Sequence, residues 1–247
     1  HVVAIQGSLS SINAEQNMLT KLIHYEAMLQ QNTFLSGKDK LGLFVPFAGT
    51  CQFVKREVLK EVGGWQDEAL SEDTELAARL TEKGYNIRFA PDVRCWQENP
   101  SKFSQLIGQR KRWLRGCMDV AFKYGKLLKR LDRRSFDAEV YFASPCMMVL
   151  ILVTYVLSVY MIFAPFSLGT YTNILTQSMS VLTLFTLFIL GVGLASLTKP
   201  RKISNVKWLP FIYLYWMTQV FVAFYALLET ALRSPRKWTK TPRTGVI

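Results

Sequence analysis

The sequence is short of the residues that small metal-stabilised or disulfide-stabilised domains rely on. Its 247 residues hold four cysteines and two histidines, and no C-x-x-C pair occurs. Zinc sites and disulfide frameworks both show as closely spaced cysteines and histidines. The scattered Cys51, Cys95, Cys117 and Cys146 therefore predict neither, and they are typical of a reducing cytosol.

Charge is absent from three long apolar stretches, residues 140–166, 171–197 and 208–228. Each stretch reaches the ~20 residues that a helix needs to cross a bilayer. Half of all residues are hydrophobic, and a soluble core in a chain of this size has little room for three such runs. The sequence thus predicts a soluble first part followed by a membrane region.

Positive charge gathers directly before the first apolar stretch. The net charge is +12. The basic side chains of this segment are Lys102, Arg110, Lys111, Arg112, Arg115, Lys123, Lys126, Lys129, Arg130, Arg133 and Arg134. Such a cluster is typical of the cytoplasmic flank of a membrane helix. A nucleic acid is the rival partner, but the adjoining apolar run favours anionic lipid headgroups, and we expect no nucleic acid partner.

The first hundred residues predict an α/β domain. The β-branched run Val2–Ile5 predicts a buried strand that stops at Gly7. Ser8–Ser11 then offers N-cap residues for a long helix over Ile12–Phe34. A polar turn follows, and Leu43–Thr50 predicts an extended segment that ends where a glycine allows close backbone approach.

Helices and strands continue to alternate in the rest of this domain. Arg56–Val62 predicts a short helix, and Ser71 is placed to cap a second helix that Gly84 ends. Asn86–Ala90 predicts the next strand, which Pro91 should terminate. This alternation is typical of an α/β layer.

Two acidic residues, Glu72 and Asp73, fall in the first turn of the helix that Ser71 caps. The positive end of the helix dipole favours their ionised form, so a carboxylate there is ready to accept a proton. This makes the pair a candidate for general base catalysis. The alternative is that the acids only stabilise the helix start.

Gln109, Arg112 and Trp113 share one face if their segment is helical, because they are three and four residues apart. Arg112 offers a planar fork for phosphate oxygens, and Gln109 adds a hydrogen-bonding amide. Trp113 offers a broad surface on which a sugar ring can stack. The alternative is an amphipathic helix anchored at a membrane surface.

The Gly63-Gly64-Trp65 turn, the acidic pair and the Q-x-x-R-W motif follow one another in an order that resembles a known family. The sequence is similar to the family 2 glycosyltransferases of the cellulose, hyaluronan, chitin and poly-N-acetylglucosamine synthase type. The family usually has threonine where Ser71 stands. The resemblance covers nearly the whole chain and implies the second half of a GT-A-like domain, followed by interfacial helices and an α-helical transmembrane region.

The resemblance also implies roles for individual residues. Asp73 corresponds to the general base, with Glu72 as its supporting neighbour. Arg112 would lie near the leaving diphosphate, and Trp113 beneath the terminal acceptor sugar, with Gln109 beside them. The F-x-G-[ST] segment that lines the acceptor site in the family is represented by Phe47, Gly49 and Thr50. An ordinary turn after a strand is the alternative for that segment.

The tail after the last apolar stretch resembles the gating loop that closes over the nucleotide in these synthases. Its candidate residues are Trp238, Lys240, Thr241 and Arg243. Lys240 and Arg243 would neutralise phosphate, and Trp238 would insert beside them. A basic tail at the membrane surface is the alternative.

No D-x-D motif occurs in the sequence. In the family this motif holds the metal and the nucleotide diphosphate. The sequence also opens at His1 in an apolar run, without a methionine or a signal peptide. We therefore expect the chain to be the C-terminal part of a longer enzyme. The Mg2+ or Mn2+ ligands would then lie upstream, no metal ligands would lie in this chain, and the chain alone would be inactive.

The resulting prediction is a processive, inverting glycosyltransferase in the cytoplasmic membrane, with its catalytic part in the cytosol. It would polymerise a nucleotide-sugar, expected to be a UDP-sugar, and translocate the polysaccharide. The predicted divisions are residues 1–100 for the catalytic part, 101–137 for interfacial helices, 138–232 for membrane or interfacial helices, and 233–247 for the tail. The alternatives are transfer of one sugar to a lipid, as in ceramide glucosyltransferases, and a non-enzymatic membrane protein that binds anions.

The third apolar stretch leaves two topologies open. If residues 208–228 span the bilayer, the basic tail ends outside, which breaks the positive-inside rule and removes the tail from the catalytic part. If the stretch lies along the membrane, the tail stays on the catalytic side. Its aromatic residues suit an interface, so we slightly favour the second arrangement.

Overall fold

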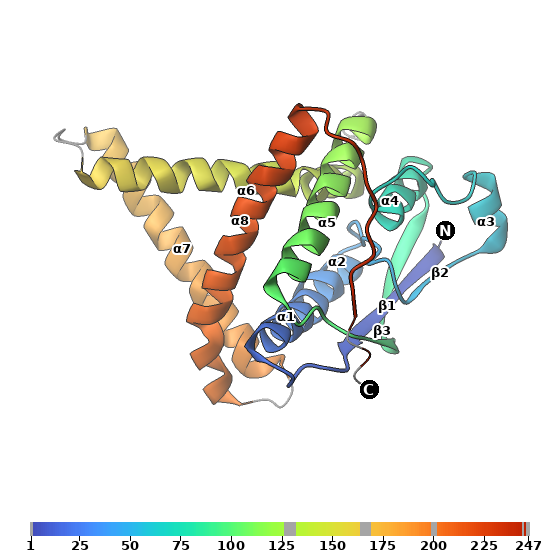
Figure 1. Cartoon of the computed structure of the whole chain (residues 1–247), viewed down its shortest axis with the longest axis horizontal. Coiled ribbons are helices and arrows are strands. Elements are labelled where there is room, and N and C mark those ends of the chain that lie inside the picture. Colours follow the sequence, from blue (N-terminus) through green and yellow to red (C-terminus); the bar gives the residue numbers. More distant parts are fainter. Residues whose placement is uncertain (1, 126–131, 164–168, 199–201, 244, 246–247) are drawn as a thin grey trace.

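The computed structural model describes residues 2–125, 132–163, 169–198, 202–243 and 245. It begins with a mixed three-stranded sheet in the order β2-β1-β3, formed by Gln52–Val54, Val2–Ser11 and Asn86–Gln97. β1 pairs antiparallel with β2 and parallel with β3. Figure 1 shows this sheet at one end of the molecule, with the helices beside it. The predicted α/β first part is confirmed.

β1 and β3 are both longer than predicted. Ser8–Ser11 continues β1 and pairs with Arg94–Gln97, so its prediction as an N-cap segment is wrong. β3 passes through Pro91 because the register shifts between Gly7 and Ser8, which leaves residues 91–93 outside the pairing. A proline is tolerated at such an irregularity because no ladder hydrogen bond is lost there.

The first helix, α1, covers Met18–Leu29 and not the predicted Ile12–Phe34. Asn17 starts it with a reciprocal cap, in which the Thr20 amide donates to the Asn17 side chain and the Asn17 amide donates to the Thr20 hydroxyl. The chain continues as a π-helix over Gln30–Leu35 and as α2 over Ser36–Lys40. The prediction of a helix here was therefore correct, but the helix begins at the Asn17–Thr20 cap and not after Ser8–Ser11.

The core of this first half lies between the sheet and α4, which covers Glu72–Glu82. Leu76, Ala77 and Leu80 of α4 are fully buried. They pack in one cluster with β1, β3 and the loop before β2, whose buried members include Val3, Ala4, Phe44, Val45, Ile87 and Phe89. The short α3, Arg56–Glu61, leads into α4 through a turn. This packing fixes the start of α4 relative to the sheet.

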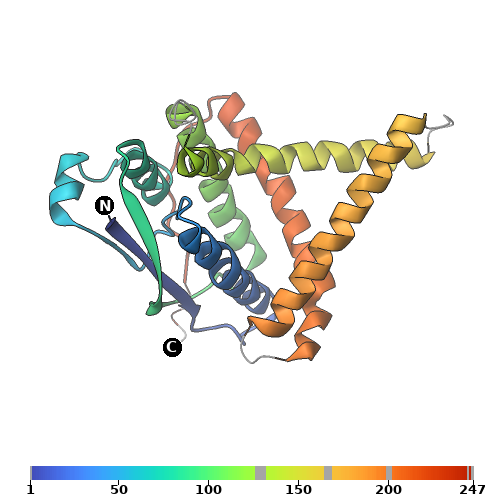
Figure 2. The ribbon, with the colours of Figure 1, turned by 180° about the vertical axis from the view of Figure 1, so that it is seen from behind.

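The second half is helical. It consists of α5 (Phe103–Tyr124), α6 (Arg133–Phe163), α7 (Thr170–Ser196), a 3-10 turn (Ile203–Trp208) and α8 (Leu209–Ala231). Figures 1 and 2 show α6 running away from the sheet, α7 returning, and α8 lying along α5. Two segments, Arg133–Thr154 and Ile203–Ala231, are long and apolar enough to cross a membrane by length and composition alone.

α8 contacts α1 at its start and α5 at its end. At its start the ring of Trp208 lies 5.9 Å from that of Tyr25 in α1. At its end Glu229 accepts a hydrogen bond from Lys111 of α5 at 2.9 Å. The inner face of α8 is buried, whereas an outer stripe is exposed at helical spacing: Phe211, Leu214, Phe221, Phe224, Tyr225 and Leu228. α8 therefore has one protein-covered face and one open apolar face.

Cys51 and Cys95 form a disulfide, which the sequence did not predict. Their Cα atoms are 5.6 Å apart although 44 residues separate them. Cys51 lies at the start of β2 and Cys95 lies in β3, and both strands flank β1. The expectation of four unpaired cysteines failed because sheet topology, and not sequence spacing, brings these two together.

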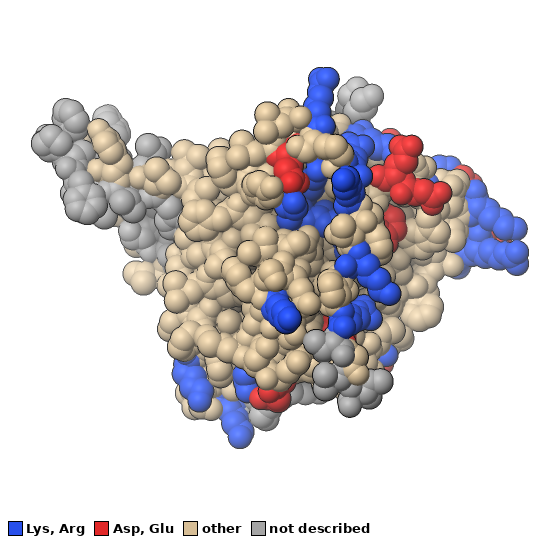
Figure 3. Space-filling model, viewed as in Figure 1, with Lys and Arg blue, Asp and Glu red and all other residues tan. Residues whose placement is uncertain are grey.

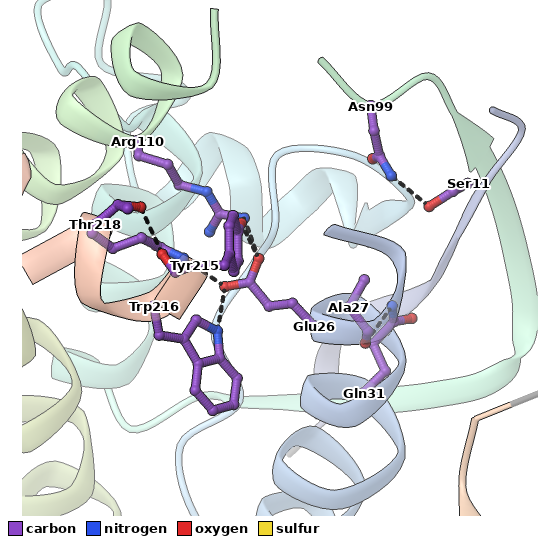
Figure 4. A network of polar contacts seen from close by, with 10 residues as sticks. Ser11, Glu26, Ala27, Gln31, Asn99, Arg110, Tyr215, Trp216 and Thr218 are labelled. Carbon is purple, nitrogen blue, oxygen red and sulfur yellow. Dashed lines mark hydrogen bonds and ion pairs between the residues drawn. The ribbon is translucent and has the colours of Figure 1, made fainter. Parts of the chain in front are cut away.

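A buried acid, Glu26, joins three helices (Figure 4). Its carboxylate pairs with Arg110 of α5 and accepts hydrogen bonds from Tyr215 at 2.8 Å, Trp216 at 3.3 Å and Gln219 at 3.1 Å, all in α8. The Glu26 and Arg110 side chains are 14% and 16% exposed. A charge pair so far from water is held by its full set of donors.

We expect Glu26→Gln to lower the free energy of unfolding by about 3 kcal/mol, because the Arg110 charge would stay buried without its counter-ion. Thermal unfolding of the full-length protein in detergent measures this loss. Glu15→Gln is the control, since that carboxylate is 79% exposed in its pair with Lys21. It should cost less than about 1 kcal/mol. Equal effects of the two substitutions would contradict a structural role for the Glu26 network.

Candidate active site

The start of α4 carries the two acidic candidates. Ser71 occupies the N-cap position, and Glu72 and Asp73 fall in the first turn, as predicted. The Ser71 side chain, however, makes no capping hydrogen bond within the described residues. Ser71 is buried, and its hydroxyl faces Gly116 of α5. The predicted cap is therefore wrong in its bonding, because a second helix covers the place where the cap would form.

Gly116 brings α5 into direct contact with the start of α4. A Cβ added to Gly116 would lie 2.6 Å from the Cβ of Ser71 and 3.0 Å from its amide nitrogen. Contacts this short do not occur between real side chains, so only glycine fits. This approach places the Q-x-x-R-W helix beside the acidic pair.

Asp73 is half-buried in this contact region. Burial raises the pKa of Asp73 from its ordinary 3.8 to about 6, with a further rise from Glu72. Backbone amides and Arg112 act in the opposite direction but do not cancel the effect. A carboxylate with a pKa near 6 is ionised at neutral pH and still accepts a proton readily.

Gly49 lies directly against the Asp73 carboxylate. A Cβ at Gly49 would lie 3.3 Å from the Oδ2 atom of Asp73, and the φ angle of Gly49 is +75°, which favours glycine. The predicted extended segment Leu43–Thr50 is a loop here, with only Gln52–Val54 forming a strand. The sequence predicted a close backbone approach at this glycine, but it predicted an extended segment where the structure has a loop.

Gln6 of β1, which the sequence did not single out, fixes the loop that carries Gly49. This side chain is fully buried. Its amide nitrogen donates to the Thr50 carbonyl at 2.9 Å, and its oxygen accepts from the Ala48 amide at 2.9 Å. The sequence could not identify Gln6, because only the structure shows that its side chain bonds to Ala48 and Thr50 on either side of Gly49.

The other two residues of the predicted acceptor segment differ from each other. Phe47 is 3% exposed and packs in the core beneath the loop, so it does not line a surface. Thr50 is exposed, and its hydroxyl lies 3.5 Å from the side chain of Gln97 in β3. Of the three predicted residues, Gly49 and Thr50 are accessible.

Arg112 lies between the acidic pair and the tail. Its Nη1 donates to the Leu70 carbonyl at 3.0 Å, and the ring of Trp238 lies 5.4 Å from its guanidinium carbon. Burial lowers the pKa of Arg112, whereas the charges of Glu72 and Asp73 raise it. The buried Nε finds no hydrogen-bond partner in the described part of the chain. The Nε atoms of Arg110 and Arg115 share this feature, so it does not mark a ligand site by itself.

Gln109 and Trp113 lie on α5 on the row that leads to Gly116. Gln109 is half-buried, and Trp113 is 36% exposed. The guanidinium of Arg110, which Glu26 holds, lies 4.8 Å from the ring centre of Trp113. One side of Trp113 is thus covered by a cation while part of the ring remains open, an arrangement suited to stacking.

The tail after α8 turns back across α5 (Figure 1). Arg115 of α5 pairs with Glu229 at 3.4 Å and donates to the carbonyls of Ser234 and of Pro235, the latter at 3.3 Å. Arg236 pairs with Asp119 of α5 at 3.2 Å. The tail thus reaches the candidate site.

Basic side chains follow the line of the tail on this face of the molecule (Figure 3). Lys240 and Arg243 are exposed, and Thr241 is half-buried. Further along, the Gly245 amide donates to Glu98 at 3.2 Å. Trp238 is the predicted gating residue that contacts a predicted site residue, Arg112.

The residues described do not form a divalent metal site. No three histidine, cysteine or acidic side chains converge in residues 2–125, 132–163, 169–198, 202–243 and 245. Glu72 and Asp73 supply carboxylate oxygens but have no third ligand of this kind beside them.

A family model described as "Glycosyl transferase family group 2" matches residues 1–228. The chain is 32% identical over 139 residues to "Probable glycosyltransferase YdaM" of Bacillus subtilis (strain 168), covering 56% of this chain and 33% of the relative. It is 24% identical over 251 residues to "Probable glucomannan 4-beta-mannosyltransferase 3" of Oryza sativa subsp. japonica, covering 98% of this chain and 43% of the relative. The chain therefore spans less than half the length of these curated relatives.

The fold is similar to that of a solved structure, "Mannosyltransferase PcManGT from Pyrobaculum calidifontis in complex with GDP-Man and Mn2+". The TM-score is 0.52 at 18% identity, and the match covers 95% of this chain and 55% of the other. This likeness confirms the predicted GT-A-like fold.

We expect Asp73→Asn to stabilise the folded protein at neutral pH. Folding raises the pKa of Asp73, so the folded wild type is most stable below pH 3.8, where the carboxyl is protonated in both the folded and the unfolded state. As the pH rises from 3.8 to about 6, the free energy of unfolding falls, because the unfolded state loses this proton first. The difference between the two pKa values corresponds to about 3 kcal/mol of stability. This is an upper value for the stabilisation by Asp73→Asn, because the site is partly open to solvent. Thermal unfolding at pH 7.5 and at pH 4.5 measures it.

The stabilisation should shrink at the lower pH, where Asp73 itself is mostly protonated. Asp67→Asn, at an exposed position in the turn before α4, is the control and should leave the stability unchanged at both pH values. A stabilisation that stays constant with pH would contradict a raised pKa at Asp73.

Proposed function

The chain belongs to the glycosyl transferase family group 2, and we propose on this basis that it carries the general base and the acceptor side of a nucleotide-sugar transferase. The observation that carries the proposal is the meeting of Asp73, Gly49 and Arg112 at the start of α4. Membership of a transferase family removes the non-enzymatic anion-binding alternative.

The proposed reaction uses Asp73 as the base. Its carboxylate takes the proton from an acceptor hydroxyl that enters the space beside Gly49, and the hydroxyl oxygen bonds to the anomeric carbon of the donor. The bond from that carbon to the nucleotide diphosphate breaks, and its electron pair leaves with the diphosphate. Arg112, whose guanidinium lies near Glu72 and Asp73, stabilises that developing charge.

Trp113 and Gln109 are the proposed acceptor contacts. Trp113 has part of its ring open, on the same row of α5 that reaches Ser71 through Gly116. An acceptor sugar stacked on this ring would present its hydroxyl toward the start of α4. Arg110 and Glu26 support the ring from the other side.

The donor and the product are proposed from the relatives, of whose length the chain spans only a part. Relatives include glucomannan 4-beta-mannosyltransferases, and the similar structure holds GDP-Man with Mn2+. GDP-mannose therefore joins the UDP-sugars as a proposed donor, with polysaccharide as the product. A divalent metal would be held by residues outside this chain. Transfer of a single sugar to a lipid is the competing outcome.

Membrane attachment is proposed through α6, α7 and α8. α6 and α7 would enter the bilayer, whereas α8 would lie along its surface. If α8 spanned the bilayer, α5 beside it would bring Arg110, Lys111 and Arg115 to membrane depth at high cost. The exposed apolar stripe of α8 instead suits burial at the level of the headgroups.

The central test is donor turnover by the full-length protein in lipid vesicles, measured as nucleotide release across GDP-mannose and a panel of UDP-sugars. Wild type should turn over one donor class. Asp73→Asn should lower kcat by at least about 100-fold, the usual contribution of a general base. Asp67→Asn is the matched control and should keep wild-type turnover.

Gly49→Ala provides a second variant, because it places a methyl group 3.3 Å from the Asp73 Oδ2 atom without altering the carboxylate. It should raise the KM for the acceptor and lower kcat. Turnover that is indifferent to Asp73→Asn would remove Asp73 as the base, and a product of one sugar on a lipid would reject polymer synthesis.

The proposed topology predicts which side of the membrane the tail occupies. A cysteine in place of Lys240 should react with an impermeant maleimide from the same side as a cysteine in place of Lys83, an exposed residue after α4. The reaction is measured separately in sealed vesicles of each of the two membrane orientations. Reaction of the two cysteines from opposite sides would show that α8 spans the bilayer and would reject the gating role of the tail.

A further inference from the structure

Arg115, one residue before Gly116, bonds to the segment where the tail leaves α8. Its side chain is 7% exposed, and its guanidinium reaches Glu229 in the last turn of α8 and the carbonyls of Ser234 and Pro235 in the tail. A single arginine fork thus joins a helix end and the backbone of the two residues that follow the turn. No other described residue of α5 bonds to the backbone of the tail.

The end of α8 is itself a defined turn. The Ser234 amide donates to the Glu229 carbonyl at 2.9 Å and the Arg233 amide donates to the Thr230 carbonyl at 3.1 Å, which together form a Schellman motif. Arg233 has a φ angle of +52°, a left-handed conformation that costs a residue with a side chain about 1 kcal/mol or more. The turn therefore needs support from contacts beyond its own bonds, and Arg115 supplies them.

Three successive contacts hold the tail to α5. Arg115 holds the carbonyls of Ser234 and Pro235, Asp119 pairs with Arg236, and Arg112 lies against the ring of Trp238. The contact to Trp238 covers one face of the Arg112 guanidinium and leaves its edge for hydrogen bonding. The direction in which the tail starts thus decides whether Trp238 reaches Arg112.

We propose that Arg115 is a positioning residue that latches the tail over the candidate site. This inference rests on the proposed function, because it assigns Arg115 to the control of donor binding at Arg112. With the latch closed, Trp238 stays on Arg112 and orients its fork for a nucleotide diphosphate. With the latch broken, the tail swings free from Arg233 onward, and a bound donor escapes more easily.

The test combines a tail assay with kinetics on the full-length protein in detergent micelles. In Arg115→Gln, trypsin should cut after Lys237 at least fivefold faster than in wild type, as followed by mass spectrometry of the peptide that begins at Trp238. The KM for the nucleotide-sugar should rise about tenfold, the effect of one lost charge-assisted hydrogen bond, while kcat changes less. Asp119→Asn should show a smaller shift of both kinds, since its pair with Arg236 is more exposed.

Arg88→Gln is the control for the loss of one positive charge. That arginine pairs with Asp39 of α2 and should leave tail cleavage and KM unchanged. Thermal unfolding checks that Arg115→Gln remains folded. Unchanged cleavage in Arg115→Gln would reject the latch, and so would faster cleavage with an unchanged KM. Absence of turnover in wild type would instead reject the proposed function, and the cleavage rates would then still decide whether Arg115 holds the tail.

Discussion

The close contact between Gly116 and Ser71 is the constraint on which the rest of the site depends. It allows the backbone of α5 to rest on the first turn of α4, so that the side chain of Arg112 reaches the region of Glu72 and Asp73. A larger residue at position 116 would push the helices apart, and the arginine would lose both its burial and its acidic neighbours. The raised pKa of Asp73 has the same origin, since the contact removes water from the carboxylate.

α5 uses its arginines in three directions. Arg112 faces the acidic pair and the tail, Arg115 faces the end of α8, and Arg110 faces Glu26 in α1. Each guanidinium is largely buried, and each keeps a buried Nε without a hydrogen-bond partner in the described part of the chain. Buried charge of this kind adds little stability by itself, but it allows few alternative arrangements. We infer that α5 is held in one orientation relative to α1, α4 and α8.

Local signals predicted the two helices that carry the candidate residues better than they predicted the surrounding fold. The helix start at Glu72 and the helical spacing of Gln109 and Trp113 are local signals, and both helices formed as expected. Ser8–Ser11 misled, because serines that suit an N-cap also fit a strand once β3 lies alongside. The Cys51–Cys95 disulfide and the Glu26 network join segments 44 or more residues apart. Such contacts follow from topology, which periodicity and capping signals do not contain.

The proposed position of α8 at the membrane surface rests on the charges of its neighbour. By composition alone α8 is as suitable for a membrane span as the first part of α6. α8 lies against α5, whose basic side chains bond to Glu26 and to Glu229 at the end of α8. Those ion pairs need the polar side of the interface, and the outer stripe from Phe211 to Leu228 needs the apolar side. A helix along the membrane surface meets both needs and leaves the tail beside Arg112.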